Sequence, residues 1–205
     1  MKNPTNLFVI SAPSGAGKTT LVKKLISRNN KLKYSVSYTT RTPRKNEIHG
    51  RDYFFVSMNT FNDLKNKKAF IEYANVFENL YATSREQVQN ILNKNHHAIL
   101  EIDWQGAQQV RKSIPQCISI FILPPSQRAL RERLTNRATD TKEIIEKRLK
   151  EALEDMSHWN EFDYCIINDE FNIAADELAA IFSAENNHSS TKNPVLIKKI
   201  KKILV

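Results

Sequence analysis

The 205-residue sequence contains little glycine, little cysteine and no long apolar segment. It has only 4 Gly and 2 Cys. Two cysteines cannot build a disulfide scaffold, and their spacing matches no metal site. Cys117 and Cys165 both lie in apolar runs, so we expect buried thiols in a reducing compartment. No apolar run approaches the ~20 residues of a membrane span, and residues 1–10 lack a secretory signal. We therefore expect a cytoplasmic protein that is neither secreted nor inserted into a membrane.

Positive charge is concentrated in two segments. The net charge is +9, and hydrophobic residues make up 40% of the chain, as in a soluble globular domain. Residues 23–51 carry nine Lys or Arg against one Glu, and residues 184–205 carry five Lys against one Glu. Such patches bind a nucleic-acid backbone or small phosphorylated ligands, and charge alone does not choose between them.

Two of the four glycines lie in one short loop, Gly15 and Gly17. The loop follows the apolar run Leu7–Ile10 and precedes apolar residues at helical spacing. It matches the phosphate-binding pattern G-x-x-x-x-G-K-[ST], except that Ala12 occupies the first glycine position. In such a loop, backbone N–H groups surround phosphates, the Lys reaches the β- and γ-phosphates and the Thr hydroxyl binds Mg²⁺. The residues that we expect to bind a nucleoside triphosphate are Ser14, Gly15, Ala16, Gly17, Lys18, Thr19 and Thr20, with Thr19 as the Mg²⁺ ligand.

Strand and helix patterns alternate along most of the chain. Apolar runs predict strands at 98–102, 118–123 and 164–167, and helical patterns follow at 104–112, 126–136, 141–158 and 171–185. This alternation predicts an α/β fold with a parallel core sheet flanked by helices. Residues 34–96 break it, with predicted strands at 34–40, 53–56 and 70–76 and a helix from the capping box at Ser84 to Asn93. We interpret this segment as an inserted mixed α+β subdomain.

Four motifs identify a family resemblance. In chain order they read Ser11-Ala12-Pro13-Ser14-Gly15-Ala16-Gly17-Lys18, Thr39-Thr40-Arg41-Thr42-Pro43-Arg44, Gly50 with Asp52-Tyr53-Phe54-Phe55-Val56, and Ile102-Asp103-Trp104-Gln105-Gly106. From about Leu7 to Glu185 the chain resembles the guanylate kinases, which are ATP:GMP phosphotransferases. The resemblance implies a P-loop nucleoside-monophosphate kinase fold that transfers the γ-phosphoryl group of ATP to GMP and dGMP, with Mg²⁺ as cofactor.

The resemblance also divides the chain into regions. Residues 1–185 correspond to the kinase domain, with the core at 1–33, 97–127 and 151–185, the GMP-binding subdomain at 34–96 and a helical lid at 128–150. Residues 186–205 lie outside it, as a linker and a basic tail in which the isoleucines share one helical face. We expect the tail to dock on its own domain, while a membrane-surface or nucleic-acid contact and self-association stay open alternatives.

The resemblance assigns the GMP site by position. Its members are Ser37, Arg41, Arg44, Tyr53, Glu72, Tyr81, Thr83 and Asp103. Arginine forks suit phosphate, which fits Arg41 and Arg44. A carboxylate at Glu72 suits the N1–H and 2-amino donors of guanine, and a hydroxyl at Thr83 can serve O6. Leu80 and Ala82 depart from the family's usual tyrosine and glycine, and Glu101 replaces its aspartate.

Cationic residues near the lid complete the expected catalytic set, which is Lys18, Arg41, Arg137 and Arg148. Arg148 lies beside the apolar face of its predicted helix and needs an anionic partner, and the resemblance assigns Arg137 and Arg148 to the phosphates. We expect helix salt bridges with Glu132, Glu151 or Glu154 for Arg131 and Arg133.

Three alternatives stay open. The chain could be a guanylate-kinase-like protein-binding module without activity, a nucleic-acid-binding P-loop ATPase, or a kinase for another nucleoside monophosphate. The sequence favours ATP and GMP as partners over nucleic acid, and leaves a homo-oligomer open.

Overall fold

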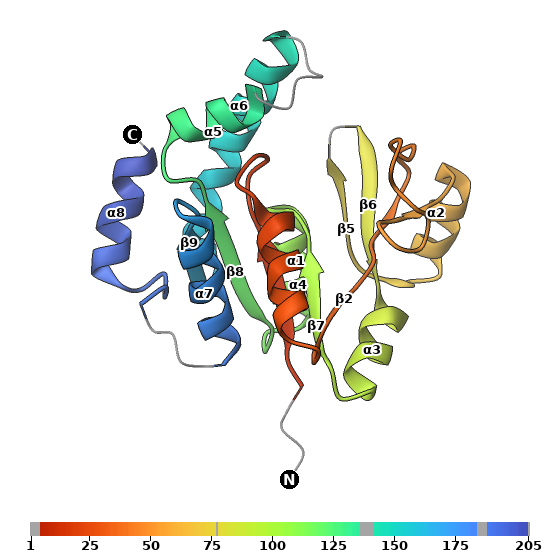
Figure 1. Cartoon of the computed structure of the whole chain (residues 1–205). Helices are drawn as coiled ribbons and strands as arrows, with labels where there is room; N and C mark the ends of the chain where they lie inside the picture. The colour runs from red at the N-terminus through yellow and green to blue at the C-terminus, as the bar shows by residue number, and fades with distance from the viewer. Residues whose placement is uncertain (1–4, 77, 136–141, 184–187, 205) are drawn as a thin grey trace. The chain divides into compact units, whose positions relative to one another are not determined.

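The computed structural model describes residues 5–76, 78–135, 142–183 and 188–204 of the chain. The elements in chain order are β1 (Leu7–Ser11), α1 (Lys18–Arg28), β2 (Leu32–Tyr34), β3 (Tyr38–Thr39), β4 (Phe54–Phe55), α2 (Met58–Asn66), β5 (Phe70–Val76), β6 (Asn79–Ser84), α3 (Arg85–Asn93), β7 (His97–Glu101), α4 (Trp104–Ser113), β8 (Ile118–Leu123), α5 (Gln127–Thr135), α6 (Lys142–Met156), the 3-10 helix η1 (Ser157–Glu161), β9 (Tyr164–Ile167), α7 (Phe171–Phe182) and α8 (Pro194–Leu204) (Figure 1). The expected α/β alternation is confirmed.

The strands form two sheets. The five-stranded sheet has the order β2-β7-β1-β8-β9, and its β2–β7 and β8–β9 pairs are parallel. Its strands are rich in β-branched and aromatic residues, and β1 is buried along its whole length, as expected for a parallel sheet that helices cover. The four-stranded sheet has the order β4-β3-β6-β5 and is mixed, because β3 pairs with β4 in parallel and with β6 in antiparallel.

The chain divides into two compact units. The first consists of Met1–Val9 and Asn30–Ile118. Its mixed sheet packs through Phe70 and Ala82 against Phe61 of α2, all of them buried. Ser57 begins α2 and Ser84 begins α3, because each hydroxyl accepts a backbone N–H one turn later. Ser84 is the capping residue that the sequence predicts.

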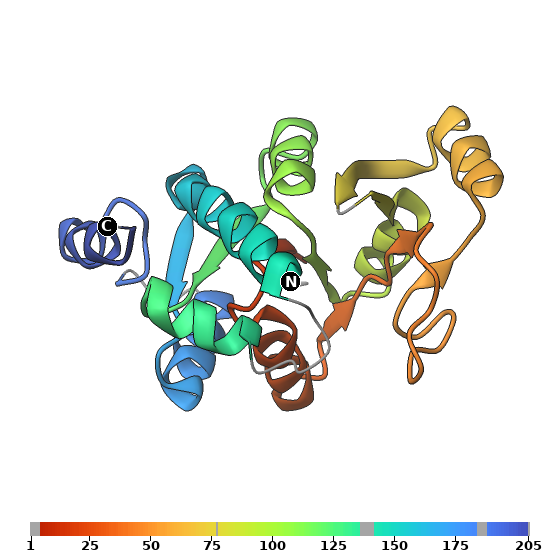
Figure 2. The same ribbon diagram turned by 90° about the horizontal axis from the view of Figure 1, so that it is seen from above.

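The second unit consists of Ile10–Asn29 and Ser119–Val205. In it α1 packs on α7, and Arg28 of α1 forms an ion pair with Asp176 of α7 at 2.6 Å. Helices α5 and α6 also lie side by side (Figure 2). Cys165 is buried in β9. Cys117, which directly precedes β8 and belongs to the first unit, is buried as well, which confirms both as core thiols. Burial raises the pKa of the Cys165 thiol.

One predicted strand was wrong. The sequence favours a single strand over 34–40, but β2 ends at Tyr34 and β3 begins at Tyr38 in the other sheet. Ser35 and Ser37 are buried in the connection, and the Ser35 N–H still bonds to the Ile99 carbonyl of β7 at 3.0 Å. Tyr, Val and Thr in this segment favour strands, and the two serines among them do not by themselves end one, so the break is seen in the change of hydrogen-bonding partner. Helix α2 and strand β6 were not anticipated.

The basic tail forms α8, an amphipathic helix that docks on its own unit. Ile200 and Ile203 are buried, while Lys198, Lys199 and the other two lysines are exposed. Gln127 of α5 donates to the carbonyl of Leu204 at 3.1 Å. These contacts therefore favour docking of the tail on its own domain over the other roles considered for it. Among the described residues, no helix has the length and apolar character needed to cross a membrane.

Candidate active site

The loop between β1 and α1 has the backbone that the phosphate-binding pattern predicts. Gly15 and Gly17 both have φ of +91°, a left-handed conformation that side chains rarely adopt. Space requires glycine as well, because a β-carbon on Gly17 would lie 2.5 Å from Nδ2 of Asn168. A β-carbon on Gly15 would lie 3.0 Å from Cδ1 of Leu130. The loop is therefore packed so tightly that its shape depends on both residues.

Asn168 and Arg133 brace this loop. Nδ2 of Asn168, which is buried, donates to the Ala16 carbonyl at 2.7 Å. The guanidinium of Arg133 donates to the Asn168 carbonyl at 2.9 Å and reaches the Ala16 carbonyl at 3.5 Å. Arg133 thus binds carbonyls where we expected a helix salt bridge. Arg131 does form a salt bridge, but its partner is Glu146 of α6 at 2.5 Å, which is not one of the three expected glutamates.

Helix α6 contributes Arg148 to the same loop. Its Nη2 donates to the Ser14 hydroxyl at 2.8 Å, so two predicted site residues 134 positions apart in sequence are in contact. Lys18 is the first residue of α1 and is half-buried, and Thr19 and Thr20 are exposed on the first turn. The first N–H groups of α1 favour an anion there. Arg137 lies outside the described residues.

The first unit holds the predicted phosphate-binding residues of the second nucleotide. The Arg41 guanidinium donates to both carboxylate oxygens of Glu47, at 2.8 and 2.9 Å. The Arg44 backbone N–H donates to the same carboxylate at 2.8 Å, while the side chain of Arg44 is exposed. Desolvation opposes ionisation of Glu47, but these hydrogen bonds outweigh it and lower its pKa. Glu47 thus holds the position of Arg41 as an anion.

Two tyrosines border Arg41. The Tyr53 ring lies 5.4 Å from Cζ of Arg41 and meets the Tyr81 ring edge to face, with 5.9 Å between centroids. Burial, with the nearby carboxylate of Glu101, raises the pKa of Tyr53 to about 12. Its phenol therefore stays a hydrogen-bond donor at neutral pH. Ser37 lies four residues before Arg41 in the sequence and is buried. Its backbone carbonyl accepts the Phe54 N–H at 2.8 Å.

The residues expected to read the base converge on one point. Glu72 of β5 and Thr83 of β6 are register partners, both buried, and the Thr83 hydroxyl donates to Oε1 of Glu72 at 2.6 Å. Asp103 begins α4 by accepting the Gly106 N–H at 2.7 Å. A β-carbon on Gly106 would lie 2.5 Å from Oε2 of Glu72 and 3.1 Å from Oδ1 of Asp103. The two predicted carboxylates therefore flank one glycine.

Comparisons with known proteins decide the family. The family model described as "Guanylate kinase" matches residues 4–185. The chain belongs to the guanylate kinase family. A guanylate kinase of Alkalilimnicola ehrlichii is 46% identical over 201 residues, covering 98% of this chain and 99% of its own. One of Pseudomonas fluorescens is 53% identical over 178 residues, covering 87% of this chain and 86% of its own.

The fold agrees with the family. The crystal structure of guanylate kinase from Anaplasma phagocytophilum is 32% identical, with a TM-score of 0.74, and the match covers 98% of this chain and 96% of that one. The chain therefore has the P-loop kinase fold of the guanylate kinases, as the sequence predicts.

The departures from the guanylate kinase pattern are accommodated by packing. Ala82 is fully buried in the cluster with Phe61 and Phe70, and Leu80 packs against that cluster. The Leu80 N–H also donates to the Thr40 hydroxyl at 3.0 Å. The loop geometry around β6 is thus supported from within the first unit.

Sequence reasoning missed Glu47, Asn168 and Gln109. Asn168 directly follows β9, and a polar residue at the carboxyl end of a buried parallel strand is a usable signal. Glu47 is the single acidic residue among the nine cations of residues 23–51, which is also a signal. Gln109, which contacts β5, has no feature in the sequence that would indicate its role.

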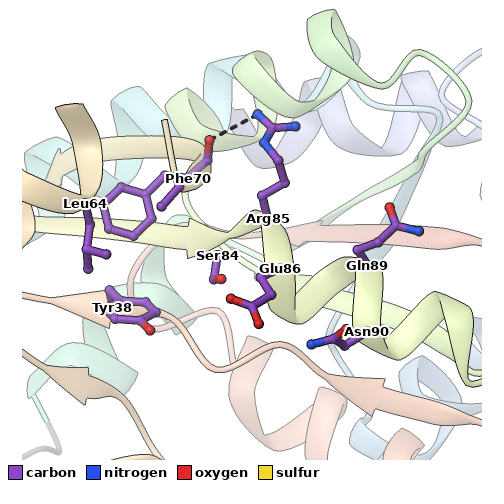
Figure 3. A pocket seen from close by; sticks show the side chains of 9 residues that line it. Tyr38, Leu64, Phe70, Ser84, Arg85, Glu86, Gln89 and Asn90 are labelled. Atoms are coloured by element: carbon purple, nitrogen blue, oxygen red, sulfur yellow. Dashed lines mark hydrogen bonds between the residues drawn. The ribbon is translucent and has the colours of Figure 1, made fainter. Parts of the chain in front are cut away.

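A cavity in the first unit lies apart from these residues. It has a volume of about 470 Å³ and is lined by Tyr38, Leu64, Ala69, Phe70, Ser84, Arg85, Glu86, Gln89 and Asn90 (Figure 3). Arg85 donates to the Phe70 carbonyl at 3.2 Å on its wall. None of the predicted site residues lines this cavity.

Proposed function

We propose that this guanylate kinase transfers the γ-phosphoryl group of ATP to GMP and to dGMP, giving ADP and GDP or dGDP. It does so with the residues that its sequence predicts. The observation that carries the ATP half is the contact between Arg148 and Ser14 beside a loop whose two glycines both have positive φ. The observation that carries the GMP half is the buried Glu72–Thr83 pair beside Gly106.

The loop from Ser14 to Thr20 binds the phosphates of ATP. Its N–H groups and the start of α1 favour the binding of an anion, and Lys18 adds a positive charge for the β- and γ-phosphates. Arg148, which already touches Ser14, supplies a second cation to the same phosphates. Arg137 belongs to this set by family position.

Thr19 fits the Mg²⁺ that family kinases need. Its hydroxyl lies on the exposed first turn of α1, next to the phosphate loop. No group of three or more His, Cys, Asp or Glu side chains among the described residues could hold a metal ion. Mg²⁺ prefers phosphate oxygens, water and one or two protein oxygens, so Thr19 together with the nucleotide suits it. The ion would neutralise charge on the β- and γ-phosphates.

Arg41, Arg44, Tyr53, Tyr81 and Ser37 bind the phosphate of GMP. Arg41 is positioned in advance, because Glu47 and the rings of Tyr53 and Phe55, 5.4 and 5.7 Å from its Cζ, hold its guanidinium. The phenol of Tyr53 remains protonated and donates to the phosphate. Preformed donors reduce the entropy lost on binding.

Glu72 and Asp103 read guanine. A buried carboxylate accepts from N1–H and from the 2-amino group, and adenine would leave it unpaired. The Thr83 hydroxyl has one proton, which it donates to Glu72. Thr83 therefore orients Glu72 directly, and with its only proton on Glu72 it does not donate to O6 of guanine, the role that the sequence predicts for it.

The chemical step needs no general base. An oxygen of the GMP phosphate forms the new bond to the γ-phosphorus, and the bond from that phosphorus to the β–γ bridging oxygen breaks, leaving its electrons on ADP. Since the attacking group is already an oxyanion, catalysis consists of positioning and of charge stabilisation by Lys18 and the arginines.

A substrate panel tests the function. The full chain with ATP and Mg²⁺ is assayed against GMP, dGMP, AMP, UMP and dTMP, and without acceptor in the presence of RNA or DNA. We expect rapid ADP formation with GMP and dGMP only. Preference for another monophosphate, or ATP hydrolysis that nucleic acid stimulates without GMP, would overturn the proposal.

A non-catalytic binding module is less consistent with these residues. Lys18, Arg41, Arg44 and Arg148 serve phosphate transfer, and a protein-binding surface does not need them. The two buried free thiols suit a reducing compartment, so we place the activity in the cytoplasm.

A further inference from the structure

Strand β5, which carries Glu72, is an edge strand. It is the last strand in the order β4-β3-β6-β5, so its outer edge has no strand partner in the part of the chain that the structure describes. Its pairing with β6 also contains an irregularity between Phe70 and Glu72, where two residues of β5 oppose one of β6. An edge strand with a bulge immediately before the functional residue is locally weak.

The side chain of Gln109 pairs with this edge. Its Nε2 donates to the Tyr73 carbonyl at 2.7 Å, and its Oε1 accepts the Tyr73 N–H at 3.2 Å. A glutamine amide carries the same donor and acceptor as a peptide group, so Gln109 replaces one residue of a missing neighbouring strand. Nε2 also approaches the Gln105 carbonyl of its own helix at 3.5 Å.

The two hydrogen bonds of Gln109 hold Tyr73, the residue next to Glu72. Successive side chains of a strand point to opposite faces, and here Tyr73 is 41% exposed while Glu72 is 2% exposed. A rotation of the backbone at Tyr73 would therefore swing the Glu72 carboxylate away from Thr83 and Gly106. Gly106 lies on α4 one turn before Gln109, so one face of α4 both leaves room for the carboxylate and holds its strand.

We propose that Gln109 is a positioning residue for guanine recognition, which fixes the main chain of β5 at Tyr73 and thereby the carboxylate of Glu72. The inference rests on the proposed role of Glu72 as the group that accepts from the 2-amino group of guanine. It predicts that Gln109 determines the preference for GMP over inosine monophosphate, which lacks that amino group.

The test uses Gln109→Met in the full chain, because Met keeps the length of the side chain and the helix propensity but removes both hydrogen bonds. We expect KM for GMP to rise about tenfold, as the loss of two hydrogen bonds suggests. The ratio of kcat/KM for GMP to that for inosine monophosphate should fall by a similar factor, while KM for ATP stays within about twofold. Gln105→Met, an exposed glutamine on the same helix, is the matched control and should behave as wild type.

Introducing Gln109→Met into a protein that already carries Glu72→Gln shows whether Gln109 acts through Glu72. In Glu72→Gln protein, Gln109→Met should change the GMP preference no further, because coupled residues are not additive. An unchanged preference and KM in the single Gln109→Met variant would overturn the inference, as would an equal rise in KM for GMP and ATP. If wild type itself does not distinguish the two monophosphates, the proposed role of Glu72 fails instead.

If the Gln109→Met variant does not fold, Gln109→Glu replaces it in the same kinetic test. Its carboxylate can accept the Tyr73 N–H but cannot donate to the Tyr73 carbonyl, so the same selective rise in KM for GMP is expected. Wild-type discrimination by this variant would likewise overturn the inference.

Discussion

Arg148 of α6 donates to the hydroxyl of Ser14 in the phosphate loop at 2.8 Å. Arg148 is half-buried and lies beside the apolar face of α6, where Leu149 and Ala152 are buried. A cation in that position requires an electron-rich partner. The hydroxyl supplies one here, and the phosphates of ATP supply a stronger one.

Arg148→Ala should lower kcat about 100-fold or more, because arginines that stabilise a transferring phosphoryl group contribute at least that much. Arg131→Ala is the matched control. Its guanidinium is exposed and pairs with Glu146 on α6, so its loss should change kcat by less than about twofold. Steady-state kinetics of both variants check the prediction, and equal effects would remove Arg148 from the catalytic set.

Gly17→Ala should damage the loop for two separable reasons. The positive φ costs about 1–2 kcal/mol for a side chain, and the β-carbon would meet Nδ2 of Asn168 at 2.5 Å. We expect a loss of about 2–3 kcal/mol in the free energy of unfolding and weaker ATP binding.

Asn168→Ala separates the two causes. The cost of Gly17→Ala should be smaller in that background, because only the backbone strain remains. Urea unfolding of the two single variants and the double variant measures the difference. Strict additivity would show that the Asn168 side chain moves aside freely.

The sequence predicts what depends on local pattern. The phosphate loop, the cap at Ser84 and the span of β5 follow from neighbouring residues, and the structure confirms each element. Family position assigns Glu72, and the structure adds that it is buried beside Gly106. The contact between Gln109 and Tyr73 joins residues 36 positions apart, so no local pattern reports it. The same limit explains the strand predicted over 34–40, because the pairing with two different sheets depends on partners distant in sequence.

Glu47→Gln tests a pH-dependent contribution to stability. The folded state lowers the pKa of Glu47 below its usual value near 4.5, so its ion pair with Arg41 stabilises the protein fully above that pH. The contribution disappears as the pH falls through the folded pKa, where the carboxylate is protonated. We expect Glu47→Gln to cost about 1 kcal/mol of unfolding free energy at pH 7.

At pH 3 the Glu47→Gln variant and wild type should differ less in stability than at pH 7. Denaturant unfolding at both pH values checks this. A difference that is the same at pH 7 and pH 3 would mean that packing, and not charge, accounts for the role of Glu47.

Glu72→Gln tests base recognition directly. The amide would present a donor where guanine also donates, so KM for GMP should rise about 100-fold and the preference for GMP over AMP should narrow. Glu86→Gln is the control, since it makes the same chemical change at an exposed position on α3. The carboxylate also accepts from the Thr83 hydroxyl at 2.6 Å, so thermal unfolding is measured in parallel to separate stability from recognition. If Glu72→Gln kept the wild-type ratio of kcat/KM for GMP over AMP, the carboxylate would only hold Thr83, and guanine would be read by other residues.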